Sequence, residues 1–186
     1  MKRNSAKDIM NLKGTRPIVC LTAYTAPIAR ALDEHVDLLL VGDSLGMVLY
    51  DYENTLSVTL PQMVEHAKSV VNASSSSCIV VDLPFGTYEE SKEKAFSNSS
   101  DVMKETNCNA IKLEGGQNMY ETVKFLTERS IPVMGHIGLQ PQRVLIEGGY
   151  KVKGKSKFEW NKFIEDALSL EEAGAFSIVL EGMTEP

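Results

Sequence analysis

Four carboxylic acids stand where short apolar runs of this 186-residue chain end. Asp43 follows DLLLVG, Asp82 follows CIVV, Glu114 follows AIKL and Glu181 follows SIVL. In parallel α/β folds the carboxyl ends of all strands lie on one side, where active sites are built. We therefore expect these acids to converge, although any single acid after a strand also commonly caps the following helix.

Converging carboxylates indicate a bound cation. They repel one another and raise each other's pKa unless positive charge compensates them. Oxygen ligands without a cysteine pair or a histidine cluster favour Mg2+, which uses a few protein carboxylates and keeps waters or substrate oxygens in its octahedral shell. The acids therefore predict a magnesium site.

Two basic side chains accompany the acids. Lys112 precedes Glu114 by two residues, which places both on the same face of a strand. A lysine in a strand-lined interior needs an anion, either a substrate carboxylate or enolate, or an acid in a structural ion pair. His136 in GHIGL also stands at a strand end, where it either forms a structural hydrogen bond or contacts substrate and relays protons.

The elements that must position these residues alternate along the chain. Six short runs have the length and β-branched content of strands covered on both faces, at residues 17–24, 37–43, 78–85, 110–116, 131–139 and 176–182. Amphipathic segments predict helices at 60–73, 89–106, 118–130 and 158–174. Alternation predicts parallel strands with right-handed crossovers, in a doubly wound sheet or a closed (β/α)8 barrel. We find no linker and expect one domain over 1–186, with a glycine- and lysine-rich loop at 148–157 as a flap or a surface excursion.

Composition excludes several classes of partner. The net charge of −6 arises from interspersed acids and bases without a basic stripe, which argues against nucleic-acid binding. No apolar run approaches the roughly 18 residues of a membrane-spanning helix, and the first residues lack a secretory signal, so we expect a cytoplasmic protein with no membrane contact. The widely spaced Cys20, Cys78 and Cys108 fit reduced core residues.

An ordered set of motifs resembles one enzyme family. LVGDSLGM, DLPFGTY, IKLEGG, GHIGLQPQ, GGYKVKG and VLEG resemble the ketopantoate (3-methyl-2-oxobutanoate) hydroxymethyltransferase family over essentially the whole chain. The resemblance implies a (β/α)8 TIM barrel of the phosphoenolpyruvate/pyruvate superfamily, Mg2+ dependence and a large homo-oligomer, often a decamer. It also implies transfer of a one-carbon unit from the co-substrate 5,10-methylenetetrahydrofolate to 3-methyl-2-oxobutanoate, which forms 2-dehydropantoate in pantothenate biosynthesis.

The resemblance also implies roles for individual residues. The metal-site acids, acting directly or through water, correspond to Asp43, Asp82 and Glu114. The contacts with the keto acid correspond to Asp43, Ser44, Asp82 and Lys112. Glu181 corresponds to the catalytic proton acceptor. We expect His136 and Tyr24 to contact these site residues and to orient them.

The chain departs from the family pattern in two places. Thr25 in TAYT replaces the aspartate usual at the end of the first strand. After VLEGMTEP the family continues through two more strand–helix units that line the folate side, so we expect an incomplete barrel of about six units. Two alternatives are therefore a catalytically impaired remnant and one half of a split enzyme. A third is a Mg2+-dependent 2-keto acid lyase of the same superfamily, although its lysine-glycine-cysteine loop signature is not found.

Overall fold

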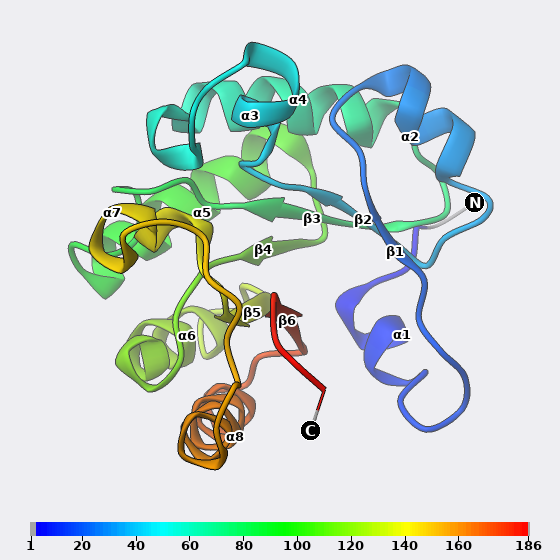
Figure 1. Cartoon of the computed structure of the whole chain (residues 1–186). Helices are drawn as coiled ribbons and strands as arrows, with labels where there is room; N and C mark the ends of the chain where they lie inside the picture. The colour runs from blue at the N-terminus through cyan, green and yellow to red at the C-terminus, as the bar shows by residue number, and fades with distance from the viewer. Residues whose placement is uncertain (1–2, 186) are drawn as a thin grey trace.

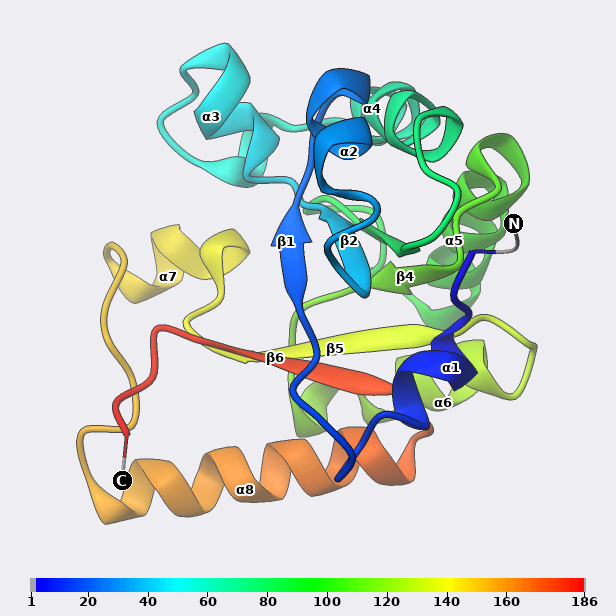
Figure 2. The ribbon, with the colours of Figure 1, turned by 90° about the vertical axis from the view of Figure 1, so that its right-hand side faces the viewer.

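The computed structural model describes residues 3–185 and contains a sheet of six parallel strands in the order β1-β2-β3-β4-β5-β6. The sheet curls into a half-barrel with helices along its outer side (Figures 1 and 2). The strands are β1 (Cys20–Thr22), β2 (Leu38–Val41), β3 (Cys78–Asp82), β4 (Ala110–Lys112), β5 (Val133–Gly138) and β6 (Ser177–Glu181). Each lies inside a range predicted from the sequence, and the parallel arrangement is confirmed.

The four predicted helices are also present. They are α4 (Leu60–Asn72), α5 (Lys92–Thr106), α6 (Tyr120–Thr127) and α8 (Lys157–Glu172). Short helices not predicted from the sequence are α1 (Ala6–Met10), α2 (Ala26–Leu32), α3 (Leu45–Tyr50) and α7 (Val144–Glu147), with 3-10 turns η1 (Thr55–Ser57), η2 (Gln117–Met119) and η3 (Pro141–Arg143). One or two turns are too short for the helical period to show in a sequence pattern.

Alternation along the strands divides the core into two layers. One set of strand residues packs with the helices and includes Leu39, Ile79 and Ile111, which are fully buried. Their strand neighbours, including Val80 and Ala110, form a second cluster on the concave side of the sheet. Side chains two residues apart share a face, so residues that follow this second set at the strand ends also point into the concavity.

The two ends of the strands are covered differently. At the amino ends of the strands, Ile9 of α1 packs into the concave cluster and covers it. At the carboxyl ends, α3 follows β2 and α7 lies after β5, and both lie on the same side of the sheet (Figure 2). The carboxyl ends therefore carry the segments that can enclose a site.

Helix ends are fixed by local side-chain hydrogen bonds. Thr59 and Gln62 form a reciprocal capping box at the start of α4, with Pro61 in its first turn. Ser156 caps α8 by accepting from the backbone N–H of Glu159. These bonds satisfy backbone groups that a helix end would otherwise leave unpaired. In the part of the chain that the structure describes, no helix is long and apolar enough to cross a membrane.

A glycine lets the last two strands meet closely at the site end. Gly138 ends β5 with a φ of +91°, and a Cβ there would lie 2.4 Å from the carbonyl oxygen of Glu181 on β6. A side chain at this position would therefore both strain the backbone and push β6 away. Gly138 brings Glu181 to the rim beside β5.

The outer strands present one unpaired edge each within residues 3–185, because β1 pairs only with β2 and β6 only with β5. Apolar side chains are exposed there, with Leu21 45% and Leu180 59% accessible. A cavity of about 680 Å3 borders β6, α1 and α8. These are the edges that strand pairing or a covering segment would protect.

A buried carboxylate fixes the turn between α4 and β3. Asp33, only 4% exposed, accepts hydrogen bonds from the Ser74 hydroxyl and from the backbone N–H groups of Ser75 (2.7 Å), Ser76 (3.0 Å) and Ser77 (3.0 Å). Burial opposes ionisation, but the hydrogen bonds outweigh it and lower the pKa of Asp33. The charged form is therefore the one that the fold stabilises.

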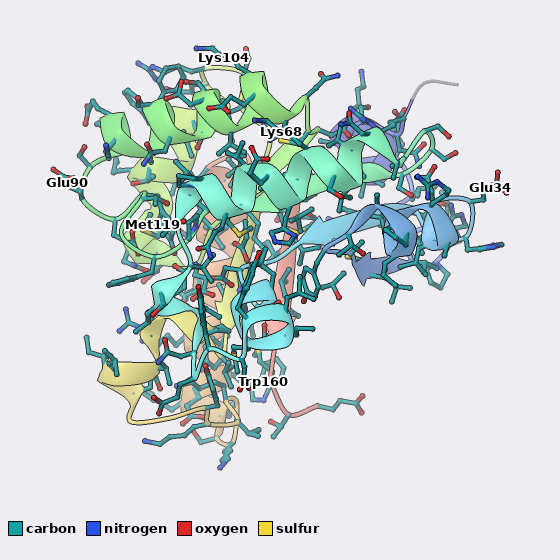
Figure 3. All side chains as sticks on the ribbon, turned by 90° about the horizontal axis from the view of Figure 1, so that it is seen from above. Glu34, Lys68, Glu90, Lys104, Met119 and Trp160 are labelled. Carbon is teal, nitrogen blue, oxygen red and sulfur yellow. The ribbon has the colours of Figure 1, made fainter. Side chains whose placement is uncertain are left out.

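We expect Asp33→Asn to lower the free energy of unfolding by about 2 kcal/mol at pH 7, because an amide directs N–H groups at backbone donors. Urea denaturation measures this change. A depressed carboxyl pKa contributes stability above its unfolded value that is lost in acid, so the difference from the parent should shrink below about pH 4. Glu34→Gln, at an exposed neighbour on the periphery (Figure 3), is the control. Equal stability of the Asp33→Asn variant and the parent would contradict this role.

Candidate active site

The predicted site residues stand at the carboxyl ends of neighbouring strands. Asp82 ends β3, Lys112 ends β4 and Glu181 ends β6. Asp43 follows β2, and Glu114 follows β4 by two residues. The parallel sheet therefore brings to one rim the acids that are dispersed along the sequence.

A buried ion pair lies at the centre of this rim. The ammonium of Lys112 lies 2.6 Å from Oδ2 of Asp82, and both residues are almost fully buried. The register pairs the two residues directly across β3 and β4. Asp43 approaches the same oxygen through its backbone N–H at 3.5 Å. The ion pair expected as one alternative for Lys112 is thus present.

One ammonium faces several carboxylates here. Burial, followed by the charge of Asp82, raises the pKa of Asp43 to about 7. Burial also raises the pKa of Glu114 to about 8, against the opposing charge of Lys112. Burial disfavours the charge of Lys112, but Asp82, Glu114 and Asp43 outweigh it and raise the lysine pKa. The cluster therefore holds extra protons unless another cation supplies positive charge.

His136 of β5 lies between two of the acids. Its Nδ1 is 3.6 Å from Oε1 of Glu114, and its Nε2 is 3.4 Å from Oε2 of Glu181. Burial, followed by the charge of Lys112, lowers the pKa of His136 to about 3, so the imidazole is neutral near pH 7. Neither nitrogen has a hydrogen-bond partner within bonding geometry. His136 therefore lies between the two acids as a buried neutral imidazole, and its role in proton relay or in structure stays a prediction.

Glu181 is the more accessible acid of the rim, with 46% of its side chain exposed. Burial of the remainder raises its pKa, an effect that Lys112 opposes and Asp82 reinforces. A carboxylate with a raised pKa, open to solvent and beside a neutral imidazole, is suited to accept a proton.

Ser44 and Tyr24 lie on the β1 and β2 side of the rim. The Tyr24 hydroxyl and Ser44 Oγ are 2.8 Å apart. Thr25 is the N-cap residue of α2, and its side chain caps no backbone N–H. The hydroxyl of Ser69 instead accepts from the backbone N–H of Ala26 at 3.0 Å. A hydroxyl of α4 thus pairs with a backbone N–H at the start of α2.

Two residues that the sequence reasoning did not single out connect the acids. Gln142, buried in η3, donates from Nε2 to Oδ2 of Asp43 at 2.9 Å and from its backbone N–H to Oε2 of Glu114 at 3.2 Å. The hydroxyl of Tyr88 donates to Oε1 of Gln142 at 2.6 Å. Both residues end motifs used for the family resemblance, DLPFGTY and GHIGLQPQ, but neither is an acid at a strand end.

The free oxygens of the cluster fit a hard cation. Oδ1 of Asp82 and Oε1 of Glu114 are buried without a hydrogen-bond partner. Carboxylate oxygens of this kind are ligands that Mg2+ prefers. Among residues 3–185, however, no group of three or more His, Cys, Asp or Glu side chains is arranged closely enough to hold a metal ion. The donor chemistry fits a cation that completes its shell with water or substrate oxygens.

The segment after α7 borders the site. Its Tyr150 hydroxyl contacts Sδ of Met47 on α3 at 3.6 Å. Burial and then the charges of acids including Asp43 and Glu114 raise the Tyr150 pKa, which places the ring in their field. A cavity of about 390 Å3 opens beside Glu114 and Gln142. The loop at 148–157 thus contacts α3 through Tyr150, on the side of the sheet where the acids lie, and its role as a flap stays a prediction.

Comparison with known proteins confirms the sequence resemblance. The profile of the ketopantoate hydroxymethyltransferase family matches residues 3–186. The chain is 56% identical over 185 residues to the 3-methyl-2-oxobutanoate hydroxymethyltransferase of Rhizobium etli and 57% identical to that of Sinorhizobium fredii, with 100% of this chain and 68% of each relative covered. The enzyme of the same name from Paramagnetospirillum magneticum is 56% identical over 186 residues, with the same coverage.

Solved structures show the same fold. A phosphonopyruvate hydrolase in complex with oxalate and Mg2+ superposes with a TM-score of 0.70 at 14% identity, covering 98% of this chain and 64% of that one. An oxaloacetate acetylhydrolase gives a TM-score of 0.67 at 14% identity, covering 98% and 65%. At 14% identity these neighbours show the fold alone, and they confirm an incomplete TIM barrel. The chain spans less than two thirds of their length.

We expect Lys112→Met to lower the free energy of unfolding by about 3–5 kcal/mol at pH 8, because it leaves buried acids without their cation. In the folded protein the pKa values of Asp43 and Glu114 are raised to about 7 and about 8, so at pH 6 both acids are largely protonated. As the pH rises through these values the two acids ionise in the folded state, and this ionisation lowers the free energy of unfolding. The loss should therefore be smaller at pH 6, as urea titration at both pH values can measure.

The control is Lys104→Met on the exposed face of α5, labelled at the periphery in Figure 3. A Lys112→Met variant with equal loss at both pH values would show that Lys112 does not neutralise these acids.

Proposed function

The chain belongs to the ketopantoate hydroxymethyltransferase family, and from this premise we propose that it transfers a hydroxymethyl group from 5,10-methylenetetrahydrofolate to 3-methyl-2-oxobutanoate, forming 2-dehydropantoate. The observation that carries the proposal is the buried Lys112–Asp82 pair, set among further acids with raised pKa values. A 2-keto acid whose C3 proton must be removed needs such a site, with cationic charge for its oxygens and a base for its proton.

We propose that Asp43, Asp82 and Glu114 hold Mg2+, directly or through water. The unpartnered buried oxygens of Asp82 and Glu114 and the excess of acids over Lys112 support this assignment. When bound, the ion acts as a Lewis acid that stabilises negative charge developing on the keto oxygen, an effect worth several kcal/mol.

The keto acid is held by residues from β2, β3 and β4. The Ser44 hydroxyl can donate a hydrogen bond while its partner Tyr24 fixes its direction. Lys112 supplies an ammonium for the substrate carboxylate or for the enolate oxygen, and Asp82 keeps that ammonium in place at 2.6 Å. Because these groups are buried, their electrostatic effect on the substrate is stronger than it would be in water.

Glu181 accepts the proton from C3 of the keto acid. Its raised pKa makes it a stronger base than an ordinary carboxylate, and its exposure lets it exchange the proton with solvent. Neutral His136 lies between Glu181, 3.4 Å away, and Glu114, 3.6 Å away. The enolate carbon forms a bond to the methylene carbon of the folate, and both bonds from that carbon to the folate nitrogens break. Water supplies the hydroxyl group, and tetrahydrofolate leaves with two protons, one from water and the one that Glu181 took from C3.

We also propose that the protein works in the cytoplasm as a homo-oligomer. The three free cysteines, one of them exposed, suit a reducing compartment. Exposed apolar side chains on α7 and α8, among them Leu145 (77%) and Phe158 (81%), offer surface for contacts between subunits.

We expect the protein, incubated with Mg2+ and 3-methyl-2-oxobutanoate in D2O, to exchange deuterium into C3, and Glu181→Gln to reduce the rate by at least about 100-fold, because general-base catalysis contributes about 10²–10⁴-fold. NMR follows the exchange. The rate should rise with pH through a pKa above the ordinary carboxyl range, because the deprotonated base is the active form. Glu165→Gln on the exposed face of α8 is the control. Absence of exchange in the folded parent would refute the enzymatic proposal and favour a silent remnant.

We expect Asp82→Asn to weaken Mg2+ binding by at least about tenfold, because it replaces a charged ligand with a neutral one. The ammonium of Lys112 would also lose its partner charge and would repel the cation. Isothermal titration calorimetry of the folded variant measures the change, with the exposed Asp101→Asn as control. Unchanged affinity in Asp82→Asn would remove this residue from the metal site.

A further inference from the structure

Gln142 has its whole side-chain amide engaged at the rim. Nε2 donates to Oδ2 of Asp43 and to the carbonyl oxygen of Leu83, each at 2.9 Å. Oε1 accepts from the Tyr88 hydroxyl at 2.6 Å. Only 5% of the residue is exposed. Gln142 therefore connects the ends of β2 and β3 from its position after β5.

The direction of this amide is fixed by its surroundings. The Tyr88 oxygen accepts from the backbone N–H of Glu114 at 3.2 Å, which leaves the tyrosine proton free to point at Gln142. In the flipped orientation the amide oxygen would face two acceptors, Asp43 and the Leu83 carbonyl, and its NH2 group would face the Tyr88 donor. Leaving such buried groups unpaired is unfavourable. The N–H groups are thereby held toward Asp43.

The same residue also contacts a second acid. Its backbone N–H donates to Oε2 of Glu114 at 3.2 Å, while Oε1 of that carboxylate has no hydrogen-bond partner. One oxygen of Asp43 and one of Glu114 are thus held by Gln142. Gln142 thus restrains both carboxylates, and Oε1 of Glu114 is left without a hydrogen-bond partner.

We infer that Gln142, oriented by Tyr88, is a positioning residue that holds the carboxylates of Asp43 and Glu114 in the orientation that binds a divalent cation. The inference rests on the proposed function, because it takes these acids as the metal site. An apolar side chain could fill the same space without desolvating an amide, so packing does not require glutamine here. Hydrogen bonds that orient ligating carboxylates commonly affect metal affinity as strongly as some ligands do.

The test is Mg2+ titration of Gln142→Met by calorimetry, because methionine keeps the length of the side chain and removes both amide donors. We expect about 10–100-fold weaker binding. Gln140→Met, at a partly exposed glutamine of the same loop, is the matched control and should bind as the parent does. Tyr88→Phe should weaken Mg2+ binding several-fold. It removes the hydrogen bond that fixes the direction of the Gln142 amide and leaves Asp43 itself unchanged.

A second measurement separates positioning from a general loss of structure. Saturating Mg2+ should restore deuterium exchange by Gln142→Met toward the parent rate, because only the affinity for the ion is impaired. Parental affinity in a folded Gln142→Met or Tyr88→Phe variant would overturn the inference while leaving the proposed function intact. A folded parent that binds no Mg2+ would overturn both together.

Discussion

The charge imbalance between Lys112 and the acids around it is the constraint on which the site depends. The buried ammonium of Lys112 lies 2.6 Å from Asp82, and Asp43 and Glu114 also contribute to raising the pKa of Lys112. In a low-dielectric interior such an excess of negative charge is unfavourable, so the cluster takes up protons or a further cation. This charge imbalance is the basis of our proposal that the site binds a metal ion together with an anionic substrate.

The acids with this charge imbalance stand at the ends of strands that are packed on both faces. Helices pack against the outer face of the sheet, and the concave face continues as an apolar layer that α1 closes from below. Gln142 and Tyr88 then supply hydrogen bonds at the rim, where the apolar layers end. Stability is thus concentrated in the sheet and helices, and the polar groups at the strand ends remain available for chemistry.

Sequence relatives and solved structures establish different properties of the chain. The relatives at about 56% identity give the family, and the solved structures at 14% identity give the architecture alone. Two of these neighbours are hydrolases with the same fold, so the fold does not by itself choose between hydrolysis and one-carbon transfer. Removal of a proton from a keto acid is our proposal, supported by the raised pKa of Glu181 and by its position 3.4 Å from His136.

The sequence by itself determined the strands, the four long helices and the acids at their ends, because periodicity and β-branched content are local properties. It also predicted that Lys112 faces the interior, from its spacing to Glu114. Only the tertiary structure decided that Lys112 pairs with Asp82, that His136 stands between two carboxylates, and that Gln142 links β2 to β4. Those partners lie 22 to 99 residues apart, and their distances depend on strand register and sheet curvature, which no local pattern encodes.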